Sequence, residues 1–300
     1  MEDTIENNKF YSGENLVFII GVPRSGTTYL QKLLSSHPNV FTGQETHIFG
    51  SYFGSAIKSW QRHSLPNKTG RVGVGLPCYL KKNQFKDKLR KLIIESLFSV
   101  SGKLNDRQIF IEKTPRHALF IPEIQFLFPK SKFIILFRNP LDTCRSLLHA
   151  GKGWGKSWAP KRAITAAALW NNYMIEIDMQ RNKVGSKCFN INYEELTKST
   201  DTILIELFQF IGIKVTYKES KAIMLNNSKE NSIIGKSGKI PIKGELANKV
   251  NQEWIEEPDG FINLEKYKLS IFEKLIIWNK TKNVCSSFGY RNSLLYFLKS

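Results

Sequence analysis

The amino-terminal part of the sequence predicts a buried strand that leads through a short glycine-bounded loop into a helix. Residues 16–22 form an unbroken apolar run, Leu-Val-Phe-Ile-Ile-Gly-Val, which is typical of a strand covered on both faces of a parallel sheet. Residues 27–36 then carry leucines at helical spacing, and His37-Pro38 ends that helix. The chain is therefore expected to open with a strand–loop–helix unit.

Strands and helices continue to alternate along the chain. Further strands are expected at 109–112, 133–137 and 187–193, and further helices at 116–128, 141–149, 162–180 and 201–211. This alternation predicts the α/β fold class, with a P-loop-like central parallel sheet flanked by helices on both faces. In such folds a ligand binds beyond the carboxyl ends of the strands.

The length of 300 residues, 41% of them hydrophobic, predicts one elaborated domain over residues 1–300. We expect residues 1–14 to be disordered and residues 50–102 to form a basic, helical insertion. Within it, residues 58–91 hold ten Lys or Arg against the single acid Asp87. This charge fits either a solvated mobile surface or a surface that meets an anionic substrate.

The formal net charge of +18 indicates an anionic ligand or partner without choosing among nucleic acid, lipid surface, phosphate and sulfated sugar. The longest apolar run, residues 16–22, is far shorter than the roughly 20 residues of a transmembrane helix. No secretory signal pattern opens the sequence, so a cytoplasmic location is expected. Four scattered cysteines lack metal-ligand spacing, so no metal site is predicted; they are Cys78, Cys144, Cys188 and Cys285.

The loop after the first strand, Gly21-Val-Pro-Arg-Ser-Gly-Thr-Thr28, lies where backbone amides and a helix dipole bind an anion. Its spacing matches the P-loop pattern except that Thr27 replaces the lysine that reaches the β- and γ-phosphates. ATP or GTP hydrolysis is therefore disfavoured. We predict a phosphate or sulfate site in which Arg24 supplies a forked cation, and Ser25, Thr27 and Thr28 supply hydroxyl and N–H groups.

A second anion site is predicted at the end of the strand 133–137. Arg138 follows this strand directly, and Ser146 lies on the next helix, so both can meet one phosphate. The alternative is that Arg138 pairs with an acid inside the fold.

With these motifs in this order, the chain resembles the PAPS-dependent sulfotransferases, which take a sulfuryl group from 3′-phosphoadenosine 5′-phosphosulfate (PAPS). In that family a Pro-Arg-Ser-Gly-Thr-Thr loop binds the 5′-phosphosulfate, and an Arg with a Ser eight residues later binds the 3′-phosphate. The resemblance extends to residues 112–117, 192–196 and 288–290. It is closest to the tyrosylprotein branch and the bacterial carbohydrate or lipid branches.

The resemblance implies that PAPS is the sulfuryl donor and that no metal is needed. It also implies a late loop, residues 232–239, that covers the nucleotide. The donor-binding residues implied are Arg24, Ser25, Gly26, Thr27, Thr28, Arg138, Ser146, Tyr193, Ser232 and Lys236.

The catalytic residues implied by the resemblance are Glu45, Lys113 and Arg24. Glu45 matches the glutamate base of the tyrosylprotein and heparan-type branches, and His47 is the rival base. Lys113 and Arg24 would stabilise the developing charge. For Lys113 the alternative is an ion pair with the neighbouring Glu112. His117 either touches the substrate or has a packing role.

The expected reaction is in-line sulfuryl transfer to an acceptor hydroxyl. The resemblance favours a carbohydrate or glycolipid acceptor over a peptide or small molecule. Trp154 and Trp158 either stack on a sugar or pack in the core, whereas Trp170 is assigned to packing. Two other functions stay open: a P-loop kinase or NTPase with Glu112 as its Mg²⁺ ligand, and a non-catalytic polyanion binder. No nucleic-acid partner is expected, since no nucleic-acid-binding module is recognisable.

Overall fold

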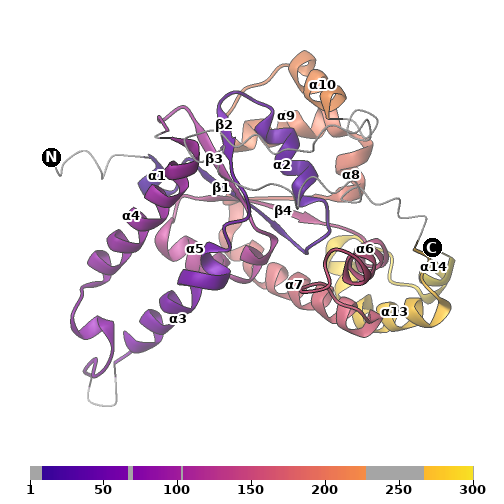
Figure 1. Ribbon diagram of the computed structural model, residues 1–300, viewed down its shortest axis with the longest axis horizontal. Coiled ribbons are helices and arrows are strands. Elements are labelled where there is room, and N and C mark those ends of the chain that lie inside the picture. Colours follow the sequence, from indigo (N-terminus) through magenta and orange to yellow (C-terminus); the bar gives the residue numbers. More distant parts are fainter. Residues whose placement is uncertain (1–8, 67–69, 103, 228–266, 300) are drawn as a thin grey trace.

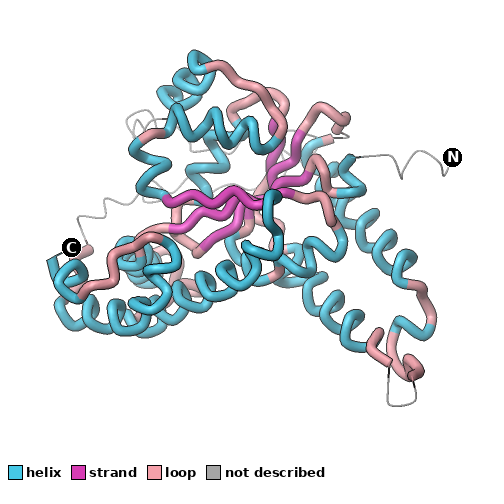
Figure 2. Tube along the Cα trace, turned by 180° about the vertical axis from the view of Figure 1, so that it is seen from behind, coloured by secondary structure: helices cyan, strands magenta, loops and turns pink. Residues whose placement is uncertain are grey.

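The computed structural model describes residues 9–66, 70–102, 104–227 and 267–299. At its centre is a five-stranded parallel sheet in the order β2-β3-β1-β4-β5, covered by helices on both faces (Figures 1 and 2). The fold class predicted from the alternating pattern is therefore confirmed. The strands are β1 (Leu16–Gly21), β2 (Val40–Thr42), β3 (Ile109–Lys113), β4 (Lys132–Phe137) and β5 (Cys188–Asn192).

Strand β1 is the central strand, and each of its residues is buried. It pairs with β3 on one side and β4 on the other, with Ile19 opposite Lys113 and Gly21 opposite Leu136. The loop that follows β1 therefore opens between the ends of its two neighbours, where parallel sheets place their ligands.

Alternate residues of the strands face two separate helical layers. Val17 and Ile19 pack with one layer, whereas Phe18 and Ile20 pack with the other. The first layer contains α2 (Thr27–Ser35), α8 (Tyr193–Lys198), α9 (Thr200–Ile211) and α10 (Tyr217–Asn226). The second contains α5 (Ile121–Leu127), α6 (Pro140–Lys152), α7 (Ala163–Val184) and α13 (Ile271–Cys285), followed by α14 (Leu294–Lys299).

Two expectations about secondary structure need correction. Strand β2 was missed because it is only three residues long and pairs with β3 alone. The helix expected at 116–128 is divided into a 3₁₀ helix, Pro115–Leu119, and the helix α5. Pro122 lies in the first turn of α5, where its missing N–H favours a fresh helix start.

The disorder expected at residues 1–14 is wrong for the described residues of this range. Helix α1 (Lys9–Ser12) is ordered, and the side chain of Phe10 is fully buried. The Phe10 ring meets Phe98 edge to face, with 5.2 Å between the ring centroids. Packing of Phe10 and hydrogen bonds from Tyr11 Oη to Asp87 O and from Lys130 N–H to Ser12 O hold this segment. Residues 1–8 lie outside the described part of the chain.

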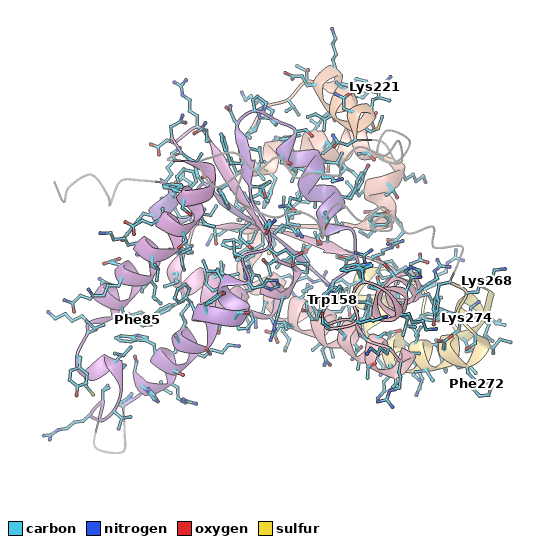
Figure 3. All side chains as sticks on the ribbon, viewed as in Figure 1. Phe85, Trp158, Lys221, Lys268, Phe272 and Lys274 are labelled. Carbon is cyan, nitrogen blue, oxygen red and sulfur yellow. The ribbon has the colours of Figure 1, made fainter. Side chains whose placement is uncertain are left out.

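Residues 54–66 and 70–101 form a helical hairpin that projects from the body of the molecule, at the lower left of Figure 1. We call it the arm. It consists of α3 (Gly54–His63), a 3₁₀ turn (Leu76–Cys78) and α4 (Lys82–Ser101). Figure 3 shows Phe85 on the arm, far from Phe272 at the other end of the molecule. Within the described residues, no helix is long and apolar enough to cross a membrane.

Candidate functional site

The predicted site residues lie at or just beyond the carboxyl ends of the strands. Arg24 follows β1, Glu45 follows β2 and Lys113 ends β3. Arg138 follows β4, and Tyr193 follows β5. Segments far apart in the sequence are therefore brought to one edge of the sheet, as the parallel topology requires.

The loop between β1 and α2 has the conformation of an anion-binding loop. Arg24 and Gly26 both have left-handed backbone angles, with φ of 72° and 101°. Among the residues that the structure describes, no side chain caps α2, so its first amides have no side-chain acceptor there. Ser25 instead anchors the loop: its hydroxyl donates to the Leu136 carbonyl at 3.1 Å, and its N–H donates to Val22 O.

Gly26 is required by the close approach of Tyr193. A Cβ atom at Gly26 would lie 2.4 Å from Cδ2 of the Tyr193 ring. The Arg138 guanidinium lies over the same ring, 4.2 Å from its centroid. Tyr193 therefore links the loop after β1 to the residue after β4. Its place near the nucleotide, which the resemblance implies, stays a prediction.

Two arginines concentrate positive charge beside this loop. Arg24 Nε donates to Ser146 Oγ at 3.1 Å. Burial, and next the charge of Arg138, lower the pKa of Arg24 to about 10, although Glu45 opposes the shift. Within the described residues, Arg138 forms no ion pair with an acid, and its buried Nε lacks a hydrogen-bond partner. An unsatisfied buried N–H of this kind fits an anionic ligand.

Lys113 and Glu45 form an ion pair beside the loop. The Lys113 side chain is 1% exposed, whereas that of Glu45 is 23% exposed. The alternative pairing of Lys113 with Glu112 is therefore wrong. His47 Nε2 lies 3.6 Å from the other Glu45 carboxylate oxygen, so both candidate bases occupy one small region.

Glu112 faces away into a buried network. Its carboxylate accepts hydrogen bonds from Thr46 Oγ1 at 2.8 Å, Thr114 Oγ1 at 2.6 Å and His117 Nδ1 at 2.7 Å. Since Phe49 N–H donates to His117 Nε2, the ring proton lies on Nδ1. His117 thus has the packing role. Because its oxygens are used within the protein, Glu112 does not fit the Mg²⁺ ligand that a kinase needs.

The hydrogen-bonded network around Glu112 should make the free energy of unfolding depend on pH. Burial opposes the charge of Glu112, but His117 and then the threonine hydroxyls lower its pKa from 4.5 to about 2. Because the folded-state pKa is depressed, this stabilisation is complete above pH 4.5 and is lost as the pH falls toward 2. We expect Glu112→Gln to cost roughly 3 kcal/mol of unfolding free energy at pH 7.

Urea unfolding of wild type and Glu112→Gln between pH 3 and 7 measures this effect. The difference in free energy should narrow below pH 4.5. Glu95→Gln, at an exposed position on α4, is the matched control and should leave stability unchanged. A difference for Glu112→Gln that stays constant over this pH range would contradict the account.

Two further residues, Trp154 and Tyr173, lie at the site although the sequence alone did not place them there. The Arg24 guanidinium carbon lies over the Trp154 ring, 5.2 Å from the ring centroid. Trp154 is therefore a neighbour of the loop after β1, which the sequence did not predict. Burial raises the pKa of Tyr173 to about 12, with Arg116 opposing and Glu45 reinforcing the shift. Tyr173 on α7 is therefore an electrostatic neighbour of Glu45. Nothing in its helical spacing signals this contact.

Trp170 has the predicted packing role and an additional one. It is fully buried, and its Nε1 donates to the Arg138 carbonyl at 3.1 Å. The bond holds the end of β4 beside α7. Ser232 and Lys236 lie outside the described residues. Within the described ranges, no cluster of His, Cys, Asp and Glu side chains could hold a metal ion.

Comparison with known proteins identifies the family. A family model described as "Sulfotransferase family" matches residues 16–217, which include the loop after β1 and the residues after β4. This chain belongs to the sulfotransferase family. The match covers every strand of the sheet described above.

This member of the sulfotransferase family is similar to protein-tyrosine sulfotransferases. It is 26% identical over 242 residues to protein-tyrosine sulfotransferase A of Caenorhabditis elegans, covering 72% of this chain and 56% of that protein. It is 25% identical over 210 residues to protein-tyrosine sulfotransferase 2 of Gallus gallus, covering 66% and 51%. The chain thus spans little more than half the length of these relatives.

Solved structures share the fold of this sulfotransferase family member. Mouse sulfotransferase SULT7A1, complexed with PAP, has a TM-score of 0.56 at 15% identity, covering 95% of this chain and 89% of that one. The sulfotransferase domain of the Synechococcus PCC 7002 olefin synthase has a TM-score of 0.53 at 16% identity, covering 92% and 94%. At these identities the likeness shows the fold alone.

Proposed function

We propose that the protein transfers a sulfuryl group from PAPS to a hydroxyl of an acceptor molecule. The observation that carries the proposal is the pair of anion-binding features at one sheet edge. One is the uncapped start of α2 with Arg24, and the other is Arg138 with its unsatisfied Nε. PAPS carries a phosphosulfate at one end and a 3′-phosphate at the other, so it needs two such features.

The donor would be held by residues that already converge. The amides and hydroxyls of Thr27 and Thr28 would meet the phosphosulfate together with Arg24, while Arg138 and Ser146 would meet the 3′-phosphate. When bound, PAPS supplies the sulfuryl group and leaves as adenosine 3′,5′-bisphosphate (PAP). Ser25 and Gly26 would shape the loop, and Tyr193 would support it. Ser232 and Lys236 stay predictions.

Glu45 is proposed as the general base. Its carboxylate is partly exposed, whereas Lys113 holds it from the buried side. Glu45 would accept the proton of the acceptor hydroxyl, and Lys113 and Arg24 would stabilise the charge that develops as the sulfuryl group moves. His47 is the alternative base, because its ring lies beside the same carboxylate.

The second part of the proposal concerns the class of molecule that accepts the sulfuryl group. The resemblance seen in the sequence favoured a carbohydrate or glycolipid hydroxyl. The relatives named protein-tyrosine sulfotransferases favour a peptide tyrosine, and we place it first. A phenol with a pKa near 10 also gives up its proton to a carboxylate more easily than a sugar hydroxyl does. Arg116 is exposed and, like Glu45, acts electrostatically on Tyr173, so its positive charge suits an acidic peptide.

An acceptor panel tests this proposal. Release of PAP from PAPS is measured in EDTA with an acidic tyrosine-containing peptide, with the same peptide carrying phenylalanine instead, and with an oligosaccharide. We expect turnover with the tyrosine peptide and none with its phenylalanine control. Turnover with the oligosaccharide alone would reverse the order of acceptors. No turnover with any hydroxyl acceptor would count against sulfuryl transfer.

Two sequence predictions are unaffected by these observations. The organisation of residues 1–300 as a single domain stays a prediction, and so does the cytoplasmic location.

A further inference from the structure

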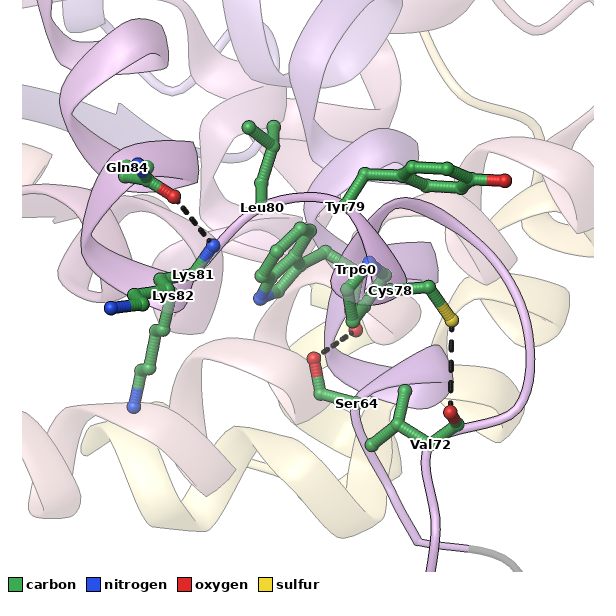
Figure 4. Close-up of a pocket in the computed structure, with 10 residues that line it drawn as sticks. Trp60, Ser64, Val72, Cys78, Tyr79, Leu80, Lys81, Lys82 and Gln84 are labelled. Carbon is green, nitrogen blue, oxygen red and sulfur yellow. Dashed lines mark hydrogen bonds between the residues drawn. The ribbon is translucent and has the colours of Figure 1, made fainter.

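The tip of the arm exposes a group of large apolar side chains outside the site described above. The tip comprises residues 62–66 and 70–82. Its most exposed apolar side chains are Leu65 (69%), Val74 (63%), Leu76 (54%) and Tyr79 (84%). Beside them is a cavity of about 570 Å³, lined among others by Trp60 and Tyr79, which Figure 4 shows. Apolar groups that gather in this way mark interaction surfaces.

The exposure of these side chains is built into the fold of the tip. Trp60 of α3 stacks on Phe85 of α4, with 4.1 Å between the ring centroids, and so joins the two helices. A Cβ atom at Gly75, where φ is 82°, would lie 2.5 Å from His63 Nδ1. Backbone hydrogen bonds close the turn, including Leu80 N to Leu76 O at 3.0 Å. The turn therefore holds Leu76 and Tyr79 outward.

The charged side chains in the sequence around this apolar group are all basic. No acidic residue occurs between Glu45 and Asp87 in the sequence. Arg62, Lys81 and Lys82 are exposed, and none of them forms an ion pair within the described residues. The tip thus combines projecting apolar side chains with a basic rim.

We propose that the arm tip docks on an anionic membrane surface. A convex tip can insert leucine, valine and tyrosine side chains into the interfacial region, while lysine and arginine meet the lipid phosphates and carboxylates. A second copy of this chain fits less well, because a symmetric contact between two tips would bring their basic rims together. This inference concerns a surface separate from the donor site and does not depend on sulfuryl transfer.

Co-sedimentation with vesicles tests the proposal. The probes are vesicles of phosphatidylcholine alone and vesicles that also contain phosphatidylserine, at low and at high salt. We expect wild type to bind the anionic vesicles at least tenfold better than the neutral ones, and to lose most of this binding at high salt. Failure of wild type to bind the anionic vesicles would overturn the proposal.

Variants test whether vesicle binding depends on the arm tip or only on the net charge of +18. Both Val74→Ser/Leu76→Ser/Tyr79→Ser and Lys81→Gln/Lys82→Gln should weaken binding about tenfold or more. Ile175→Ser/Met179→Ser, at exposed positions on α7, is the matched control and should bind like wild type. Far-ultraviolet circular dichroism checks that each variant is folded. Equal losses in tip and control variants would overturn the proposal.

Light scattering without vesicles tests whether the arm tip instead binds a second copy of this chain. We expect the apolar tip variant to have the same oligomeric state as wild type. A dimer that only the tip variants dissociate would contradict the proposal and assign the tip to self-association.

Discussion

Glu45→Gln is expected to lower kcat for sulfuryl transfer by about 10³-fold, because the amide cannot accept the acceptor proton. The change conserves the size of the side chain and removes the charge that pairs with the buried Lys113 ammonium. Donor binding should change much less, since the proposed contacts to PAP come from other residues. Steady-state turnover and calorimetric titration with PAP, measured on the same preparation, separate the two effects.

His47→Asn and Glu95→Gln are the controls for this prediction. The first tests the rival base, whose ring lies 3.6 Å from Glu45. The second removes an exposed carboxylate on the arm. Both variants should keep kcat within about threefold of wild type. Full activity of Glu45→Gln would remove Glu45 from the role of base, and a large loss in His47→Asn alone would assign that role to His47.

Arg138→Ala should raise the Kd for PAP about 50-fold. Charge-assisted hydrogen bonds contribute roughly 1.5–3 kcal/mol, and the buried Nε of Arg138 is available for one of them. The substitution also relieves the repulsion that Arg24 experiences, which offsets the loss of the contact between Arg138 and the Tyr193 ring. Calorimetric titration of the two proteins with PAP measures the effect.

Arg107→Ala is the matched control, because Arg107 is exposed and precedes β3 at the opposite end of the sheet. It removes the same formal charge from the protein. If its Kd for PAP rose as much as that of Arg138→Ala, the loss would reflect net charge alone and the proposed 3′-phosphate site would be wrong.

The main strands were predictable because their signal is local. The run from Leu16 to Val22 is apolar without interruption, which is typical of a strand buried on both faces. Strand β2 has no such run, since Val40–Thr42 gains its place only by pairing with Ile109–Ile111. The break before α5 depends on Pro122, which periodicity of apolar residues does not register.

The site was predictable as a set of residues but not as a set of contacts. Arg24, Arg138 and Tyr193 follow strand ends, and parallel topology brings strand ends together. The partner of Lys113 was not predictable, because Glu45 is 68 positions away and Glu112 is its neighbour in the chain. A strand points adjacent side chains to opposite faces, so Glu112 joins His117 in the core while Lys113 faces Glu45.

We expect this sheet edge to bind a bisphosphorylated nucleoside without a metal. Calorimetric titration of wild type with PAP in EDTA, beside ADP with Mg²⁺, tests it most directly. We expect saturable binding of PAP in EDTA and no comparable binding of ADP with Mg²⁺. Preference for ADP with Mg²⁺, or no binding of either nucleotide, would contradict it.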